Sequence, residues 1–250
     1  MGAFGTLLRR ELAVYLWSIT GWVVLAAVAF LIGLSFVDLL VAVQQAPLPM
    51  HVTEVFYQTP YFWMILLLSG PVITMRLFAQ EKAAGTYETL MTSPVRDGTV
   101  VLAKFTAAMV FYLIVWLPLL GSVVLIRSWT GEARALEWPV LASTYLGIAL
   151  LGLLFVSMGC FASALTRSQT VAAMVTGLLG VSLFLLGFAV PTGGTEAPWW
   201  ARVLGLFTLV EHMRDFTRGI VDLRPVVLYG SLSGAFLYLT MRVVESRHWK

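Results

Sequence analysis

Six long runs of apolar residues limit what this chain can fold into. The runs cover residues 20–43, 60–78, 100–126, 140–165, 170–190 and 226–241. Because a helix needs about 20 predominantly apolar residues to cross the hydrocarbon core of a bilayer, each run predicts one membrane-spanning helix. Charged residues make up only 12% of the chain, whereas a soluble domain carries about 25%. We therefore predict an all-α integral membrane protein with six transmembrane helices, in which residues 1–250 form a single domain.

The distribution of Lys and Arg predicts how these helices are oriented. Cytoplasmic connections of membrane proteins carry an excess of these two residues. With the N-terminus inside, most of the 16 Lys and Arg residues fall on the cytoplasmic side, and the first outer connection, 44–59, contains none. Both termini are therefore expected in the cytoplasm.

The N-terminal segment, residues 4–17, has the pattern of an amphipathic helix. Apolar residues lie on one face of such a helix, and Arg9, Arg10 and Glu11 lie largely on the others. This pattern is typical of a helix that lies in the membrane interface. A signal peptide is the alternative, but the apolar run that follows, 21–37, is too long for one and lacks an A-x-A cleavage site.

A polar segment between the second and third runs, residues 76–104, predicts a short helix outside the membrane. Gly85 permits backbone angles that other residues avoid, and Thr86 can cap a helix that carries Glu88 in its first turn. Pro94 ends this helix, because the residue before a proline avoids helical geometry. The helix would have about two turns.

One face of this predicted helix is apolar and exposed. Tyr87, Leu90 and Met91 are spaced at i, i+3 and i+4, which places them on the same face. A short helix with such a face, held beside a membrane, is suited to bind a groove on another protein.

Ionisable residues avoid the interior of the six runs. Arg76, Lys104, Arg127 and Arg242 lie at the ends of runs, where long side chains are expected to extend to the lipid headgroups. Transporters coupled to ions usually need ionisable residues near the middle of the membrane, so this pattern argues against a secondary transporter. Cys160 lies within an apolar run and is expected to be buried and inert.

The sequence also lacks the common signatures of catalytic and nucleotide-binding sites. It contains no G-x-S-x-G, no H-E-x-x-H, no G-x-x-x-x-G-K-[ST] and no pair of cysteine clusters. We expect no catalytic, cofactor-binding or metal-binding residue in this chain, and no nucleic-acid partner. A membrane protein of this kind is either passive or driven by another subunit.

The connection before the last run, residues 191–225, is long and mixed in character. It contains the interfacial pair Trp199–Trp200 and a broken apolar pattern that ends near Gly219. We predict two short helices that re-enter the outer leaflet, since backbone at membrane depth is tolerated where it packs against protein. An amphipathic loop on the solvent side is the alternative.

Two motifs resemble those of a known family. The segment EKAAGTYETLMTSPV, followed by the lysine of VLAKF, resembles the cytoplasmic segment of ABC-2 type transporter permeases. The segment EHMRDFTRGIVDLRP resembles the H-x-x-x-F-x-R-G-x-x-D-L motif of the same family. Its motif residues are His212, Phe216, Arg218, Gly219, Asp222 and Leu223. Within that family, the chain looks most like the compact gliding-motility and nitrous-oxide-reductase-maturation type permeases.

The resemblance implies a membrane subunit that is driven by a partner. Such permeases pair as two six-span subunits in the bacterial cytoplasmic membrane, and each binds one cytoplasmic ABC ATPase, which holds ATP and Mg. The coupling helix would be residues 85–92, and the N-terminal helix would form a second contact. The residues implied at the ATPase interface are Glu81, Lys82, Gly85, Thr86, Tyr87, Glu88, Leu90, Met91 and Pro94.

The same resemblance predicts how the protein moves and what it does. Gly70 and Pro71 offer a hinge in the second span, because proline removes a helical hydrogen bond. The function implied is ATP-driven export of a substrate. The alternatives are a mechanotransmission subunit that acts on a periplasmic or outer partner without transport, and a passive channel or scaffold.

Overall fold

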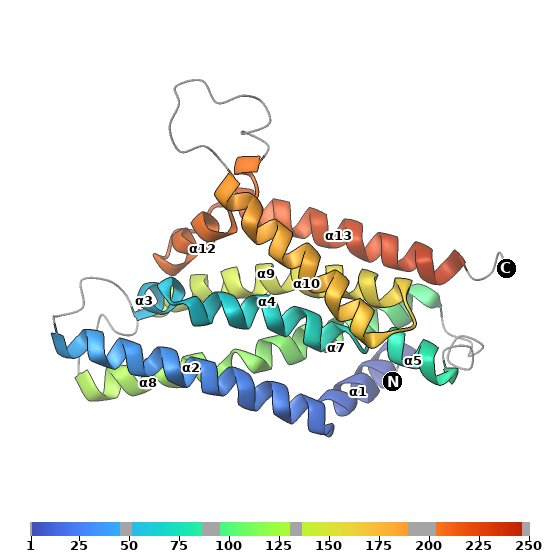
Figure 1. Ribbon diagram of the computed structural model, residues 1–250, viewed down its shortest axis with the longest axis horizontal. Helices are drawn as coiled ribbons and strands as arrows, with labels where there is room; N and C mark the ends of the chain where they lie inside the picture. Colours follow the sequence, from blue (N-terminus) through green and yellow to red (C-terminus); the bar gives the residue numbers. More distant parts are fainter. Residues whose placement is uncertain (1, 46–51, 87–95, 131–136, 190–203, 247–250) are drawn as a thin grey trace.

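The computed structural model of the protein describes residues 2–45, 52–86, 96–130, 137–189 and 204–246, and these contain helices but no strand (Figure 1). The helices are α1 (Ala3–Leu16), α2 (Ile19–Gln45), α3 (Val52–Gln58), α4 (Pro60–Thr74), α5 (Ala79–Ala84), α7 (Asp97–Val115), α8 (Leu117–Thr130), α9 (Trp138–Leu165), α10 (Gln169–Leu186), the short 3-10 turn η2 (Gly187–Ala189), α12 (Leu209–Thr217) and α13 (Leu223–Glu245).

Six helical segments in the described part of the chain are long and apolar enough to cross a membrane. They are Ile19–Val41, Pro60–Ala84, Asp97–Trp129, Trp138–Leu165, Gln169–Ala189 and Leu223–Glu245. Each corresponds to one of the six apolar runs, so the all-helical, six-span prediction is confirmed at this level. The predicted N-terminal helix is present as α1.

Helix α9 forms the centre of the bundle, where it contacts α4, α7, α10, α12 and α13 (Figure 1). Glycines allow this close packing. A Cβ atom at Gly152 would lie 2.1 Å from Cε1 of Tyr112 on α7, and one at Gly159 would lie 1.9 Å from Oγ1 of Thr74 on α4. Cys160, which belongs to α9, is fully buried, as predicted. In contrast, α2, α10 and α13 expose much of their apolar surface, as lipid-facing helices do.

The two ends of the bundle carry different elements. Figure 1 shows α1, α5 and the C-terminal end of α13 at one end, which we call the α1–α5 end. Helices α3 and α12 lie toward the opposite end, which we call the α3–α12 end. Helix α3 was not predicted, because its seven residues fall in a connection that lacks a long apolar run.

Two membrane-spanning segments are interrupted. The third span breaks at Trp116, between α7 and α8, where Pro118 lacks a backbone N–H. The carbonyl of Trp116 accepts a hydrogen bond of 2.9 Å from the Tyr145 hydroxyl. The second span runs without a break through Gly70 and Pro71 to Thr74, and its interruption lies four residues beyond the proline, between α4 and α5. A hinge at Gly70–Pro71 stays a prediction.

Parts of two predicted elements fall outside the described residues. Helix α12 is the second of the two short helices predicted before the last span, and the segment 190–203, which would hold the first, is not described. Gly219, which was predicted to close this region, has a φ of +84° just after α12.

Candidate functional site

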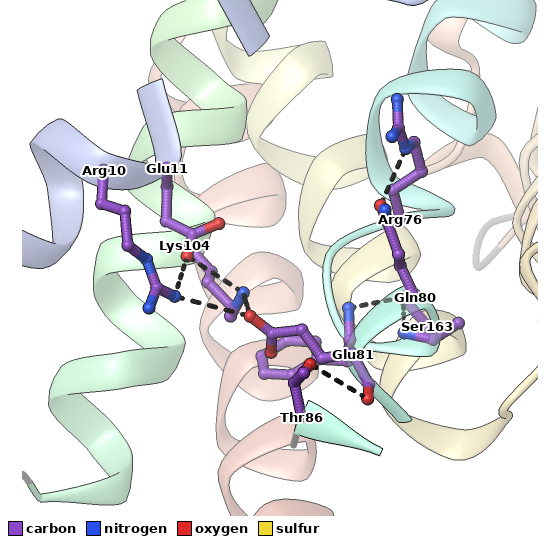
Figure 2. A network of polar contacts seen from close by, with 10 residues as sticks. Arg10, Glu11, Arg76, Gln80, Glu81, Thr86, Lys104 and Ser163 are labelled. Atoms are coloured by element: carbon purple, nitrogen blue, oxygen red, sulfur yellow. Dashed lines mark hydrogen bonds and ion pairs between the residues drawn. The ribbon is translucent and has the colours of Figure 1, made fainter. Parts of the chain in front are cut away.

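Four charged side chains from three helices meet at the α1–α5 end (Figure 2). Lys104, in the second turn of α7, places its Nζ 2.8 Å from Oε1 of Glu81 on α5 and 3.2 Å from Oε1 of Glu11 on α1. Arg10 of α1 places Nη2 2.6 Å from the same oxygen of Glu11 and 3.5 Å from that of Glu81. We call these four residues the charge cluster, and their formal charges cancel.

Burial makes Lys104 the central member of this cluster. Its side chain is only 3% exposed, and that of Glu11 is 9% exposed. A charge this far from water is tolerated only when it is paired and hydrogen-bonded. The prediction that Lys104 extends to the headgroups is therefore wrong, because two carboxylates within the protein lie in direct contact with its ammonium group.

The packing of α1 explains why Glu11 is buried. Leu7, Glu11 and Tyr15 are spaced by four residues, so they share one face of α1. Tyr15 stacks on Phe111 of α7, with ring centroids 4.8 Å apart, and its hydroxyl donates to the carbonyl of Ile73 at 2.9 Å. Glu11 was predicted to lie away from the packed face, and this is wrong. Its neighbours Arg9 and Arg10 are exposed, as predicted.

Contacts with α9 hold α5 in place after the break in the second span. The Ser163 hydroxyl oxygen accepts hydrogen bonds from the backbone N–H groups of Phe78 and Ala79, at 3.0 and 3.1 Å. The ammonium group of Lys82 donates to the carbonyl of Ala164. Glu81 and Lys82 are thus bonded to α7, α1 and α9. No sequence motif marks Ser163 for this role, because its two N–H partners are available only where the helix is interrupted.

The segment predicted to bind a partner begins where α5 ends. Gly85 has a φ of +72°, as its predicted role requires, and a Cβ atom there would meet open space. The Thr86 hydroxyl donates to the carbonyl of Glu81 at 3.5 Å. The remaining residues of the predicted interface lie outside the described residues: Tyr87, Glu88, Leu90, Met91 and Pro94.

At the opposite end, the second motif connects α12 to the rest of the bundle. Phe216 packs against Gly147 of α9, and its carbonyl accepts a hydrogen bond of 2.7 Å from Ser143. Asp222 caps α13 by accepting from the backbone N–H of Arg224 at 3.0 Å. These contacts give the motif residues packing and capping roles.

An ion pair and a glycine complete this arrangement. Nη2 of Arg218 lies 2.7 Å from Oε1 of Glu54 on α3, and the Glu54 side chain is only 5% exposed. A Cβ atom at Gly219 would lie 3.3 Å from Cγ2 of Val140, at the start of α9. The motif therefore joins α3, α9, α12 and α13.

His212, the histidine of this motif, contacts α13. Its Nδ1 lies 2.8 Å from the hydroxyl of Tyr229 on α13. Burial lowers the pKa of His212 below its ordinary value of 6.5, and nearby carboxylates, chiefly Asp215, oppose this shift only in part. The neutral ring is thus the form that the fold favours.

This pKa shift predicts a loss of stability in mild acid. The unfolded chain binds the proton more tightly than the folded protein does. The contribution of neutral His212 to the free energy of unfolding is therefore complete above pH 6.5 and is lost as the pH falls below it. We expect the melting temperature in detergent to fall between about pH 7 and about pH 5.5, and to fall less in His212→Gln, which cannot be protonated there. An equal fall in both proteins would contradict this assignment.

The comparisons with known proteins agree with this architecture. The model of the family described as ABC-2 family transporter protein matches residues 43–241. The chain belongs to this family. A search of curated proteins finds no match. ABC-2 permeases are non-catalytic, multi-pass membrane domains that work with ABC ATPase subunits. The finer resemblance to the gliding-motility and nitrous-oxide-reductase-maturation type stays a prediction. Among the described residues of this ABC-2 permease, no group of His, Cys, Asp and Glu is arranged to hold a metal ion.

Proposed function

We propose that this ABC-2 permease is the membrane subunit of an ATP-driven exporter, moved by a separate cytoplasmic ATPase. The ATPase would bind residues 85–92, directly after α5. One observation carries the proposal: Glu81 of α5 pairs with the buried Lys104 of α7 and lies beside α1. A helix bonded in this way passes a displacement of the binding segment on to the membrane spans.

The contacts of α5 define the route of that motion. Glu81 connects α5 to α7 and α1, while Lys82 and the Ser163 hydrogen bonds connect it to α9. When ATP binding closes the ATPase, a pull on residues 85–92 moves α5 together with the inner ends of three other helices. The second span then tilts, either at Gly70–Pro71 or at the interruption between α4 and α5.

The orientation and assembly belong to the same proposal. The α1–α5 end faces the cytoplasm, with both termini on that side, because this orientation places most Lys and Arg residues inside. Two permease subunits, identical or paralogous, assemble with two ATPase subunits in the bacterial cytoplasmic membrane.

Charge substitutions in the binding segment test the proposal. We expect Tyr87→Asp combined with Leu90→Asp to abolish co-purification of the ATPase from membranes, because an apolar contact face would carry two charges. Leu206→Asp is a matched control, since Leu206 is an exposed apolar residue at the opposite end. ATPase binding that is unchanged in the double variant, with the protein folded and inserted, would disprove the binding site.

Transport in inverted vesicles separates export from mechanotransmission. Export predicts that candidate substrates accumulate in inverted vesicles only when ATP is supplied. A complex that hydrolyses ATP in response to an outer partner, without accumulation of any candidate, would favour the mechanotransmission alternative.

A further inference from the structure

A cavity of about 590 Å³ lies beside the charge cluster, between α1 and the interruption that separates α4 from α5. Its walls are partly apolar, from Val14, Leu77 and Ala84, and partly charged, from the cluster and Arg76. Its volume is within the range of about 300–1,000 Å³ that is typical of small-molecule sites.

The cavity lies at the depth of the lipid headgroups. Nη1 of Arg76 donates a hydrogen bond of 2.7 Å to the Thr20 hydroxyl, in the first turn of α2. Thr20 lies between Trp17 and Trp22, whose exposed fractions are 89% and 65%. Tryptophan side chains are enriched at the boundary between lipid and water. Arg76 is therefore held at this boundary, where phosphate groups of lipids lie.

Arg76 supplies the positive charge of the cavity. Its Nε donates to Oε1 of Gln80 at 2.9 Å, so both of its hydrogen-bond partners are neutral. In the described part of the chain no carboxylate pairs with it, and the charge cluster beside it is neutral. A half-buried guanidinium in this setting is suited to bind a phosphate through charge-assisted hydrogen bonds.

Glu81 supplies a second, different site of recognition. Its Oε1 contacts Lys104, whereas its Oε2 is buried and accepts no hydrogen bond from the residues described. A buried carboxylate oxygen without a donor is costly, so rotation of the Glu81 side chain, which lines the cavity, toward a ligand with an N–H or O–H group is favoured. The cavity thus offers Arg76, which can bind an anionic group, and Glu81, which can accept a hydrogen bond from a donor group of the same ligand. The two residues are five positions apart in sequence.

We propose that this cavity binds the headgroup of a membrane phospholipid. The lipid phosphate pairs with Arg76, its ammonium or hydroxyl group donates to Glu81, and its glycerol end lies along the apolar wall. Phosphatidylethanolamine and phosphatidylglycerol satisfy both sites, whereas phosphatidylcholine has the phosphate but no N–H or O–H donor. The bound lipid connects α1 to the second span. This inference depends on the membrane location of the family and not on the direction of transport.

Lipid binding to the delipidated permease tests this proposal. Phosphatidylethanolamine, phosphatidylglycerol, phosphatidylcholine and inorganic phosphate are each added, and affinity is measured by native mass spectrometry and by thermal shift. We expect the two donor lipids to bind at least about tenfold more tightly than phosphatidylcholine. Inorganic phosphate that reproduces the full thermal shift would overturn the lipid assignment, as would equal affinity for all three lipids.

Variants locate the binding within the protein. Arg76→Gln is expected to weaken binding of the donor lipids at least about tenfold, because the phosphate loses its cation. Arg9→Gln is the matched control, since Arg9 is exposed on α1 and does not line the cavity. Arg76→Lys keeps a positive charge and is expected to retain part of the affinity, which separates loss of charge from loss of fold.

Unchanged binding in Arg76→Gln, or an equal loss in Arg9→Gln, would overturn the proposal.

Discussion

Replacement of Lys104 by methionine is expected to cause a large loss of stability and of ATP-driven activity. Lys104 is the buried cation between Glu81 and Glu11, at 2.8 and 3.2 Å. Without it, two carboxylates share a site that Arg10 alone cannot neutralise. Removal of one partner from a buried ion pair costs about 3–5 kcal/mol. Thermal unfolding in detergent and ATPase stimulation by the permease measure the two effects.

A second substitution distinguishes this charge effect from a loss of packing. Lys104→Met leaves the charge cluster with a net charge of −1, and the additional change Glu81→Gln restores neutrality. We expect the double variant to recover much of the melting temperature that the single variant loses. Activity is expected to recover less, because the bond between α5 and α7 is still missing. If the single variant melts like the unchanged protein, the cluster does not connect these helices.

The membrane spans were predictable because their signal is local. A run of about 20 apolar residues has few alternatives to a membrane helix, whatever the rest of the chain does. The same holds for Gly85, where a polar segment between two spans needs a residue that adopts positive φ. Both features depend only on residues that are close together in the sequence, so the sequence alone is enough to predict them.

The charge cluster was not predictable in the same way, since its members are distant in sequence. Glu11 belongs to an amphipathic helix predicted in the membrane interface, Glu81 to a polar connection and Lys104 to the start of a span. In such places the usual expectation is contact with water or headgroups. One signal for the cluster is present in the sequence. Glu11 shares its helical face with Leu7 and Tyr15, and a charged residue within a packed stripe implies a buried partner.

The α3–α12 end shows an intermediate case. The motif that contains His212 and Arg218 was identified by resemblance, but the partner of Arg218 was not. Glu54 belongs to a short helix inside a connection, where no periodic pattern extends far enough to reveal it. Only the tertiary structure shows that α12 packs against α3 and that the carboxylate of Glu54 is buried there.

The ion pair at this end is expected to make Arg218→Met the other strongly destabilising substitution. It leaves the carboxylate of Glu54, with a side chain only 5% exposed, without its cation. Since the Arg218 side chain is itself 39% exposed, water can reach the site in part, and the cost is expected toward the lower end of about 3–5 kcal/mol. The melting temperature falls, and hydrogen exchange of α3 and α12 becomes faster.

Arg214→Met is the matched control, because Arg214 is exposed on α12, the helix that ends directly before Arg218, and forms no ion pair among the described residues. It should leave both measurements unchanged, whereas Glu54→Gln added to Arg218→Met should restore much of the lost stability. Faster exchange in α3 and α12 alone would show that these helices unfold as a local unit above the packed α9. Equal effects of the two arginine substitutions would mean that α12 is held by Phe216 and its apolar neighbours, and not by the ion pair.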